Sequence, residues 1–351
     1  MEQSGYYGEL NLDGLTAQIQ DLFPDFSIDL NSFLGKILEG KAGDAFRELF
    51  GSIRDGLWAQ IDGMRNLMLL LLIIGILSAL FTVVMQTFRN HQIAEIAHFV
   101  SYLLLLLTVI SAFSQASDEA ARLLERILLF VRLFVPTFML AQGFCAGTAT
   151  AAGYYQLILL LIYIVEQLLL IIGLPMVNLY MLLVVMNGIW EEERLTTLLE
   201  LVQKTVVGAL KFLLTCITGI GVLQSMITPV LENLKLGTAS KVLSAIPGLG
   251  GLAEGTTQLL LGSAVLIKNG LGVAAILLLL LLCAVPLLKL FVYGGILKLC
   301  AGLMGLAADK RLTGCVNAAG DAMLLLLRIS GTAAACFLIL FAVITCLAGT
   351  V

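Results

Sequence analysis

The sequence predicts an all-α polytopic membrane protein with about eight transmembrane helices, preceded by a small acidic helical segment. Three observations predict this class. Of the 351 residues, 60% are hydrophobic and only 13% are charged, whereas soluble domains contain about 25% charged residues. The mean hydropathy is +1.01. Residues 1–64 carry 11 acidic and 4 basic side chains, a net charge of −7, which leaves residues 65–351 with a net charge of +3.

The chain therefore divides into an acidic extramembrane segment, residues 1–64, and a multi-pass membrane domain, residues 65–351. In the first segment, apolar residues recur at the spacing of amphipathic helices. Trp58 and Arg65 mark the membrane boundary, where aromatic and basic residues are enriched. The apolar stripe could dock a partner, lie on the lipid surface or close a small helical core. The residues expected to dock a partner are Phe46, Phe50, Leu57 and Trp58.

Apolar runs of about 20 residues, long enough to cross a bilayer, predict the spans. The first three predicted spans are residues 67–88, 96–113 and 127–144. A charged connection, residues 118–126, is expected to join the second span to the third. The apolar run 156–190 is too long for one span, and Gly173-Leu174-Pro175 is expected to split it into spans four and five. A single kinked helix is the alternative, and it would reverse the topology of everything downstream.

The remaining elements alternate polar and apolar runs. Residues 191–204 predict a polar helix lying along the membrane, because its apolar residues share one face. The last three predicted spans are residues 206–227, 273–290 and 322–348. Basic residues are shared almost equally between the two sets of loops, so the positive-inside rule does not fix the orientation.

The stretch 238–272 organises the rest of the chain. It contains a Pro-Gly-rich break at residues 246–251, a short apolar run, and a polar hinge at residues 268–272. Irregular backbone survives in hydrocarbon only when it is buried in protein or lines a wet cavity, and broken helices build the binding sites of transporters. The stretch could therefore be a re-entrant hairpin, or two interfacial helices joined by a surface loop. The residues expected to line or gate a pathway here are Pro247, Gly248, Gly250, Gly251, Lys268, Asn269 and Gly270.

Polar side chains inside predicted spans are a second set of candidates. An ionisable group there costs roughly 2.5–3.5 kcal/mol on insertion scales, so each is a functional hypothesis. Glu166 is the sharpest, and we expect it to pair with a lysine of another span or to be protonated. These groups could line a pathway, or could simply hold helices together. The other expected intramembrane polar contacts are Asn178, Lys211, Gln224 and Lys289.

Sequence motifs of catalysis are missing. The chain has no phosphate-binding Gly-Lys-Thr/Ser loop, no nucleophile elbow and no HExxH zinc motif. The seven cysteines form no CxxC pair, and the two histidines do not make a metal site. We therefore expect a protein that is not an enzyme and holds no metal or cofactor, so that any energy from ATP would come from another subunit.

Four segments, in this order along the chain, carry a resemblance to a known family. They are Gln92-Ile93-Ala94-Glu95-Ile96-Ala97 leading to Tyr102, Lys241 with Ile246-Pro247-Gly248-Leu249-Gly250-Gly251, Lys268-Asn269-Gly270-Leu271-Gly272, and Pro286-Leu287-Leu288-Lys289. Together with the acidic N-terminal segment, they resemble the stage III sporulation protein AE (SpoIIIAE) family.

This resemblance implies a multi-pass protein of the mother-cell membrane that surrounds the engulfed forespore. It implies membership of the SpoIIIA–SpoIIQ channel complex, with other SpoIIIA-type subunits and, indirectly, SpoIIQ as partners, and an ATPase subunit supplied in trans. Family members usually begin with a secretory signal, which MEQSGYYGEL does not resemble. A signal removed before Met1 would place residues 1–64 in the space between the two membranes.

The leading hypothesis is a subunit of a channel or secretion platform. A stand-alone transporter or permease for a small solute, and an assembly scaffold without its own pathway, are the alternatives. Small-residue surfaces permit close helix packing, so we also expect a homo-oligomer. These surfaces are Gly294-Gly295 and Gly302…Gly305.

Overall fold

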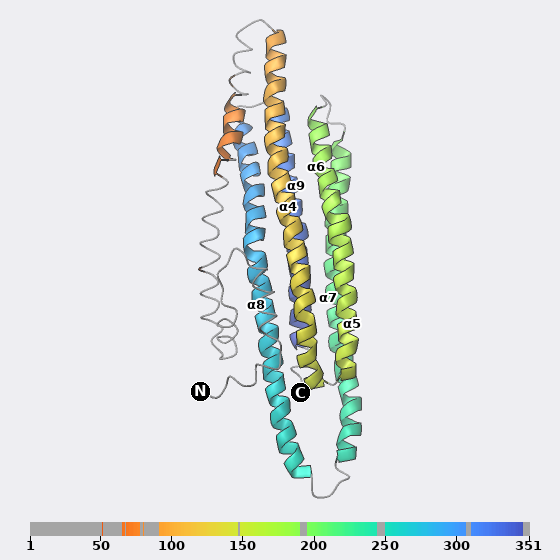
Figure 1. Cartoon of the computed structure of the whole chain (residues 1–351). Coiled ribbons are helices and arrows are strands. Elements are labelled where there is room, and N and C mark those ends of the chain that lie inside the picture. The colour runs from red at the N-terminus through yellow and green to blue at the C-terminus, as the bar shows by residue number, and fades with distance from the viewer. Residues whose placement is uncertain are drawn as a thin grey trace.

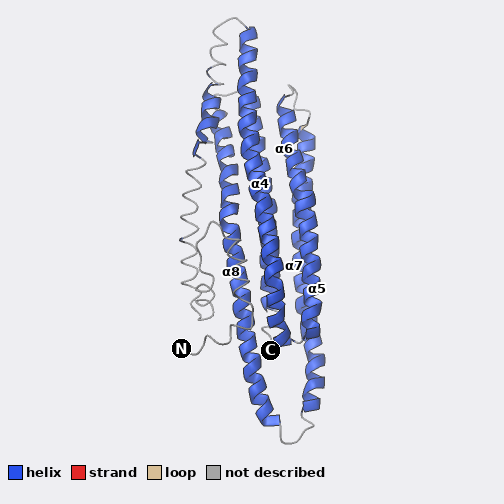
Figure 2. Cartoon of the chain, viewed as in Figure 1, coloured by secondary structure: helices blue, strands red, loops and turns tan. Residues whose placement is uncertain are grey.

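The structure, a computed structural model, is an elongated bundle of long helices that run up and down beside one another (Figure 1). It describes residues 51, 65–66, 68–77, 80, 91–146, 148–189, 195–243, 250–306 and 310–346. The elements are α4 (His91–Ala146), α5 (Thr148–Glu166), the π-helix η1 (Gln167–Gly173), α6 (Leu174–Ile189), α7 (Thr196–Leu243), α8 (Gly250–Met304) and α9 (Lys310–Cys346). The described elements are all helical (Figure 2), so the predicted fold class is confirmed at that level.

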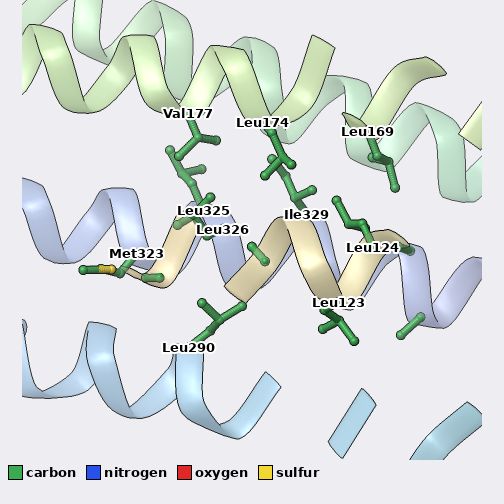
Figure 3. Packing of buried hydrophobic residues seen from close by; sticks show 14 of the residues in the cluster. Leu123, Leu124, Leu169, Leu174, Val177, Leu290, Met323, Leu325, Leu326 and Ile329 are labelled. Atoms are coloured by element: carbon green, nitrogen blue, oxygen red, sulfur yellow. The ribbon is translucent and has the colours of Figure 1, made fainter. Parts of the chain in front are cut away.

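Helix α9 lies at the centre of the bundle, because it contacts α4, α6, α7 and α8. Its Leu326, Ile329 and Phe337 are fully buried. Figure 3 shows leucine, isoleucine and methionine side chains from α4, η1, α6, α8 and α9 meeting in one core. Nearer the other end of α9, three rings are in contact, with centroids 5.6–6.3 Å apart: Phe130, Phe134 and Phe341. Most of the interior of the bundle is thus filled with apolar side chains.

The second and third predicted spans are one helix. Helix α4 has 56 residues and passes straight through residues 118–126, so the charged connection expected there is wrong. The stretch Asp118–Arg126 contains Glu, Ala, Arg and Leu, which favour helix, and no glycine or proline. An ion pair one turn apart, Glu119–Arg122 at 3.0 Å, adds support. Charge alone therefore does not end this helix.

The split at Gly173-Leu174-Pro175 is also wrong, and the single interrupted helix is the correct alternative. Helices α5 and α6 are joined by the seven-residue π-helix η1. The Leu174 N–H donates to the Leu169 carbonyl oxygen, five residues back. Because a proline ring clashes with the carbonyl four residues before it, the wider π-helical turn lets the chain continue through Pro175.

The described part of the expected polar helix, residues 196–204, and the sixth span form one helix, α7, of 48 residues. The polar hinge 268–272 is wrong, because these residues lie inside the continuous 55-residue helix α8. The break falls between α7 and α8: residues 244–249, with Pro247 and Gly248, lie outside the described residues, and Gly250 and Gly251 begin α8. In Figure 1 the adjoining ends of α7 and α8 extend past the other helices.

The described residues contain five helices that are long and apolar enough to cross a membrane, not about eight. They lie within residues 99–140, 158–188, 196–219, 270–304 and 310–343. The first predicted span is represented by the shorter apolar helix Met68–Leu77. Phe46, Phe50, Leu57 and Trp58 lie outside the described residues, so partner docking by the N-terminal segment stays a prediction.

Candidate functional site: a polar belt across the bundle

A charged pair joins α4 to α8 inside the bundle. Lys289 Nζ lies 3.3 Å from Glu119 Oε1, and the two side chains are only 14% and 17% exposed. Glu119 Oε2 also accepts a hydrogen bond from Arg122, whose outer part reaches solvent or lipid. Two enclosed charges are tolerated because each neutralises the other and further hydrogen bonds satisfy the remaining atoms. The pair therefore fixes the register of α4 against α8.

A hydrogen bond joins α6 to α4 close to the Glu119–Lys289 pair. Ser117 Oγ donates to Asn178 Oδ1 at 3.0 Å. Ser117 lies half a turn from Glu119 on α4, so polar groups of α4 face α8 on one side and α6 on the other. Asn178 was predicted as a mid-span polar residue, and its partner is the α4 hydroxyl.

The register of α7 and α9 follows from two further contacts. The Leu195 N–H donates to Asn187 Oδ1 at 3.0 Å where α7 begins, and α7 runs antiparallel to α6 (Figure 1). Nine residues along α7, Lys204 therefore lies at the level of Asn178. Similarly, Lys298 contacts Asp321 between the antiparallel helices α8 and α9. Nine residues back along α8 and nine residues forward along α9, Lys289 therefore lies near the level of Ser330 and Arg328.

These residues lie in one region of the bundle, with Ser330 nearer to the level of Gly173 than to that of Asn178, and we name this region the polar belt. Inside it are the Glu119–Lys289 pair and Ser330, whose fully buried Oγ has no hydrogen-bond partner within the described part of the chain. On the outside, Arg122, Lys204 and Arg328 are exposed. The members of the belt are Ser117, Glu119, Arg122, Asn178, Lys204, Lys289, Arg328 and Ser330.

Apolar surface continues on both sides of the belt, and an interhelical ion pair of the described residues lies on each side. Toward the α8 C-terminus, Lys298 Nζ contacts Asp321 Oδ2 and Asn317 Oδ1, both at 2.8 Å, with Lys298 and Asp321 each 32% exposed. On the other side of the belt, Arg132 of α4 pairs with Glu166 at the end of α5. In this pair Arg132 is 51% and Glu166 26% exposed.

The structure thus gives Glu166 an interhelical partner, but an arginine and not the expected lysine. Lys211 is exposed on α7, away from the belt. The side chains of Gln224, Lys268 and Asn269 lie outside the described residues, and Gly270 is half-buried in α8. The predicted residues near 247–251 are therefore not brought together with Glu166 in the part of the chain that the structure describes.

Four members of these pairs were not among the predicted site residues: Glu119, Arg132, Lys298 and Asp321. Glu119 was placed in a loop, and Asp321 beyond the end of a span. For Glu119, the signal that could have found it is the helix-forming composition of residues 118–126, which contain no glycine or proline. No such signal surrounds Asp321, which directly follows Gly320. Among the described residues, no group of three or more His, Cys, Asp or Glu side chains could hold a metal ion.

The fold and the belt define a polytopic helical membrane protein whose long helices are joined by interhelical ion pairs. Comparison with known families goes further: the family model described as stage III sporulation protein AE matches residues 28–349. The chain therefore belongs to the stage III sporulation protein AE family, as the resemblance predicted, and membership gives it a role in sporulation.

One relative is the stage III sporulation protein AE of Bacillus subtilis (strain 168), which is 24% identical over 234 residues. The matched region covers 65% of this chain and 59% of the relative's length. No solved structure matches the chain significantly.

Proposed function

We propose that this chain is a non-enzymatic membrane subunit of a SpoIIIA–SpoIIQ-type channel or secretion platform between mother cell and forespore. It would lie in the mother-cell membrane around the forespore, with residues 1–64 in the intermembrane space. Its partners would be the other SpoIIIA-type subunits, an ATPase subunit acting in trans, and indirectly SpoIIQ.

The observation that carries this proposal is the packed interior of the single chain. Large apolar side chains fill the bundle axis between α4 and α9, including the three phenylalanine rings in contact. A passage through a bundle needs a polar, hydrated lining. A pathway would therefore form between chains, which favours a subunit of a larger platform over a stand-alone permease.

The Arg132–Glu166 pair supports the same proposal from the outside. A half-exposed guanidinium on a membrane helix is costly when it faces lipid alone. A neighbouring subunit that supplies polar groups to Arg132 and Glu166 would remove that cost. This pair is therefore the place where a passage or a subunit contact would meet the surface of the chain.

The test compares two glutamates in sporulating cells. Glu166→Gln removes the charge that pairs two helices, and the matched control Glu200→Gln removes one that pairs with Lys204 of its own helix at 2.9 Å. We expect Glu166→Gln, but not the control, to reduce passage of a small tracer from mother cell to forespore, while the SpoIIIA-type partners still co-purify.

Loss of co-purification by Glu166→Gln would point to the scaffold alternative. Solute uptake by the purified chain alone in liposomes would favour the permease alternative. Unchanged passage and unchanged assembly in both variants would show that Glu166 is not part of the pathway.

A further inference from the structure

Interhelical ion pairs connect four helices of the bundle to one another. They join α4 to α5, α4 to α8 and α8 to α9, and none of them includes α6 or α7. We name α4, α5, α8 and α9 the frame, and we name α6 together with residues 196–208 of α7 the arm. The three pairs of the frame are Arg132–Glu166, Glu119–Lys289 and Lys298–Asp321.

The two helices of the arm are joined to each other at its tip. The Leu195 N–H donates to Asn187 Oδ1 at 3.0 Å, and α7 runs antiparallel to α6 (Figure 1). Pro175 lies twelve residues before Asn187, and Gly208 lies thirteen residues after Leu195. Because the two helices are antiparallel, Pro175 and Gly208 lie at nearly the same level, which is the base of the arm.

On the α6 side, the base of the arm follows a π-helix. The π-helix η1 ends at Gly173, and Pro175 has no N–H to donate to the helix. Helix kinks occur at prolines and at π-helical turns. Before this point the chain is seated on the frame, since a Cβ atom at Gly173 would lie 3.4 Å from Ile329 Cδ1 of α9. The regular α-helical hydrogen bonding is therefore interrupted where α6 leaves the frame.

On the α7 side, the base of the arm is Gly208. Among the residues inside a helix, only proline is less favourable than glycine. A Cβ atom at Gly208 would meet nothing within 4 Å, so no close approach of another helix requires glycine at this position. What glycine adds is conformational freedom of the backbone. Both helices of the arm thus have a point of bending at its base.

Polar contacts hold the arm more firmly at its base than near its tip. At the base, Ser117 Oγ donates to Asn178 Oδ1 at 3.0 Å. Toward the tip, Tyr102 Oη lies 3.5 Å from the Val185 carbonyl oxygen, beyond the usual range of about 2.5–3.0 Å for an O–H···O hydrogen bond. The contact that bending at the base would open first is therefore the longer one.

Apolar packing also holds the arm against α9. Figure 3 shows Leu174 beside Ile329 and Val177 beside Leu325. Both helices of the arm belong to candidate membrane spans, and lipid chains are as apolar as the side chains that they would replace. In a bilayer, apolar contacts of this kind are not held together by the hydrophobic effect, so they permit separation.

We propose that the arm swings about its base, away from α4 and α9, while the frame keeps its shape. At about 1.5 Å per residue, α6 extends roughly 21 Å from Pro175 to Ile189. A bend of about 20°, at which helix kinks become sharp, therefore moves the tip by roughly 7 Å. The swing separates Val185 from Tyr102 and uncovers the side of α9 that faces the arm. It holds whether the chain lines a passage or acts as a scaffold.

Distances between spin labels in the full chain, reconstituted in lipid nanodiscs, test this motion. In a variant lacking the seven native cysteines, Leu107→Cys on α4 is combined with Leu198→Cys on α7 to report on the arm. The same α4 label combined with Leu299→Cys on α8 reports on the frame. All three leucines are exposed, so the labels leave the packing intact. Pulsed electron paramagnetic resonance measures both pairs.

The key variant is Gly208→Ala, and its matched control is Gly219→Ala. Gly219 lies on the same helix beyond the arm, and a Cβ atom there also meets nothing within 4 Å. We expect two distances for the arm pair, the longer by roughly 7 Å, and one distance for the frame pair. Gly208→Ala should reduce the fraction at the longer distance about threefold to fivefold, because alanine favours the straight helix, whereas Gly219→Ala should leave it unchanged.

Pro175→Ala restores an N–H at the other side of the base and should also reduce the longer distance, so the test does not depend on one variant. Three results would overturn the proposal. The first is a single arm distance as narrow as that of the frame pair. The second is a longer distance that neither Gly208→Ala nor Pro175→Ala reduces, or that Gly219→Ala reduces equally. The third is a second distance of the same size in the frame pair, because the whole bundle then changes shape.

Discussion

Two ion pairs of this protein join α4 to another helix in opposite settings. The Glu119–Lys289 pair is enclosed between α4 and α8, with exposed fractions of 17% and 14%. The Arg132–Glu166 pair lies at the surface of the same helix, and Arg132 is half exposed. Removing one member of an enclosed pair strongly destabilises the fold, whereas a surface pair contributes little to the free energy of unfolding. The first therefore holds the bundle together, and the second remains available to a neighbour.

The largest effect is expected from Lys289→Met. This change leaves the Glu119 carboxylate enclosed, with Arg122 as its remaining charged partner among the described residues, so the free energy of unfolding in mixed micelles should fall by about 2–3 kcal/mol. The double variant Glu119→Gln/Lys289→Met removes both charges and should recover most of the loss. A single variant as stable as the unchanged protein would show that the pair is not enclosed, and the contrast between the two pairs would fail.

Two glycines, Gly188 in the interior and Gly208 at the surface, allow interior and surface positions to be compared without changing a charge. A Cβ atom at Gly188 would lie closer to Tyr102 Oη than van der Waals contact allows, whereas a Cβ atom at Gly208 meets nothing within 4 Å. Tyr102 is buried and its Oη lies 3.5 Å from the Val185 carbonyl oxygen. We expect Gly188→Ala to lower the unfolding free energy by about 1–2 kcal/mol.

The matched control Gly208→Ala should leave stability unchanged or raise it by up to about 1 kcal/mol, because alanine favours the helix. Thermal unfolding in detergent distinguishes the two variants. Equal midpoints would mean that Tyr102 moves aside at no cost and that the α4–α6 contact is loose.

The all-helical membrane class could be predicted from composition alone, but the helix boundaries could not. Hydropathy identifies each apolar run, and a charged stretch between two runs is usually a loop. Here Asp118–Arg126 has helix-forming residues and continues α4, and its charge is accommodated by Lys289, 170 residues away. A partner so distant in the chain leaves no local pattern in a single sequence.

For the candidate site too, the sequence indicated single residues but not their distant partners. Glu166 could be singled out because it is a lone carboxylate in a long apolar run, and the structure places it in an interhelical pair. Its partner Arg132 was visible as a charge inside a predicted span, but nothing local connected the two. The π-helix η1 could not be predicted either, because Gly173 and Pro175 favour a turn as well as a widened helix.

Asp321→Asn tests an ion pair whose exposure lies between those of the Glu119–Lys289 and Arg132–Glu166 pairs. The Lys298–Asp321 pair is about one-third exposed on both sides, and Lys298 also donates to Asn317, so the lysine keeps one partner when the charge is removed. We expect a loss of about 1 kcal/mol in unfolding free energy, between the losses for Lys289→Met and for Arg132→Gln. The control Glu200→Gln, in an exposed pair one turn apart, should change it by less than about 0.5 kcal/mol. A loss as large as that of Lys289→Met would contradict this ordering by exposure.

The smallest effect on the isolated chain is expected from Arg132→Gln. The lost attraction to Glu166 is worth less than about 1 kcal/mol at an exposed site, and removing a charge from a membrane helix offsets part of that loss. The same variant should reduce passage of a small tracer from mother cell to forespore more than Lys211→Gln, which removes another exposed cation from a spanning helix, while partner subunits still co-purify. Opposite behaviour, with a large loss of stability and unchanged passage of the tracer, would mean that Arg132 is a structural residue of the bundle and that no passage meets the chain at Glu166.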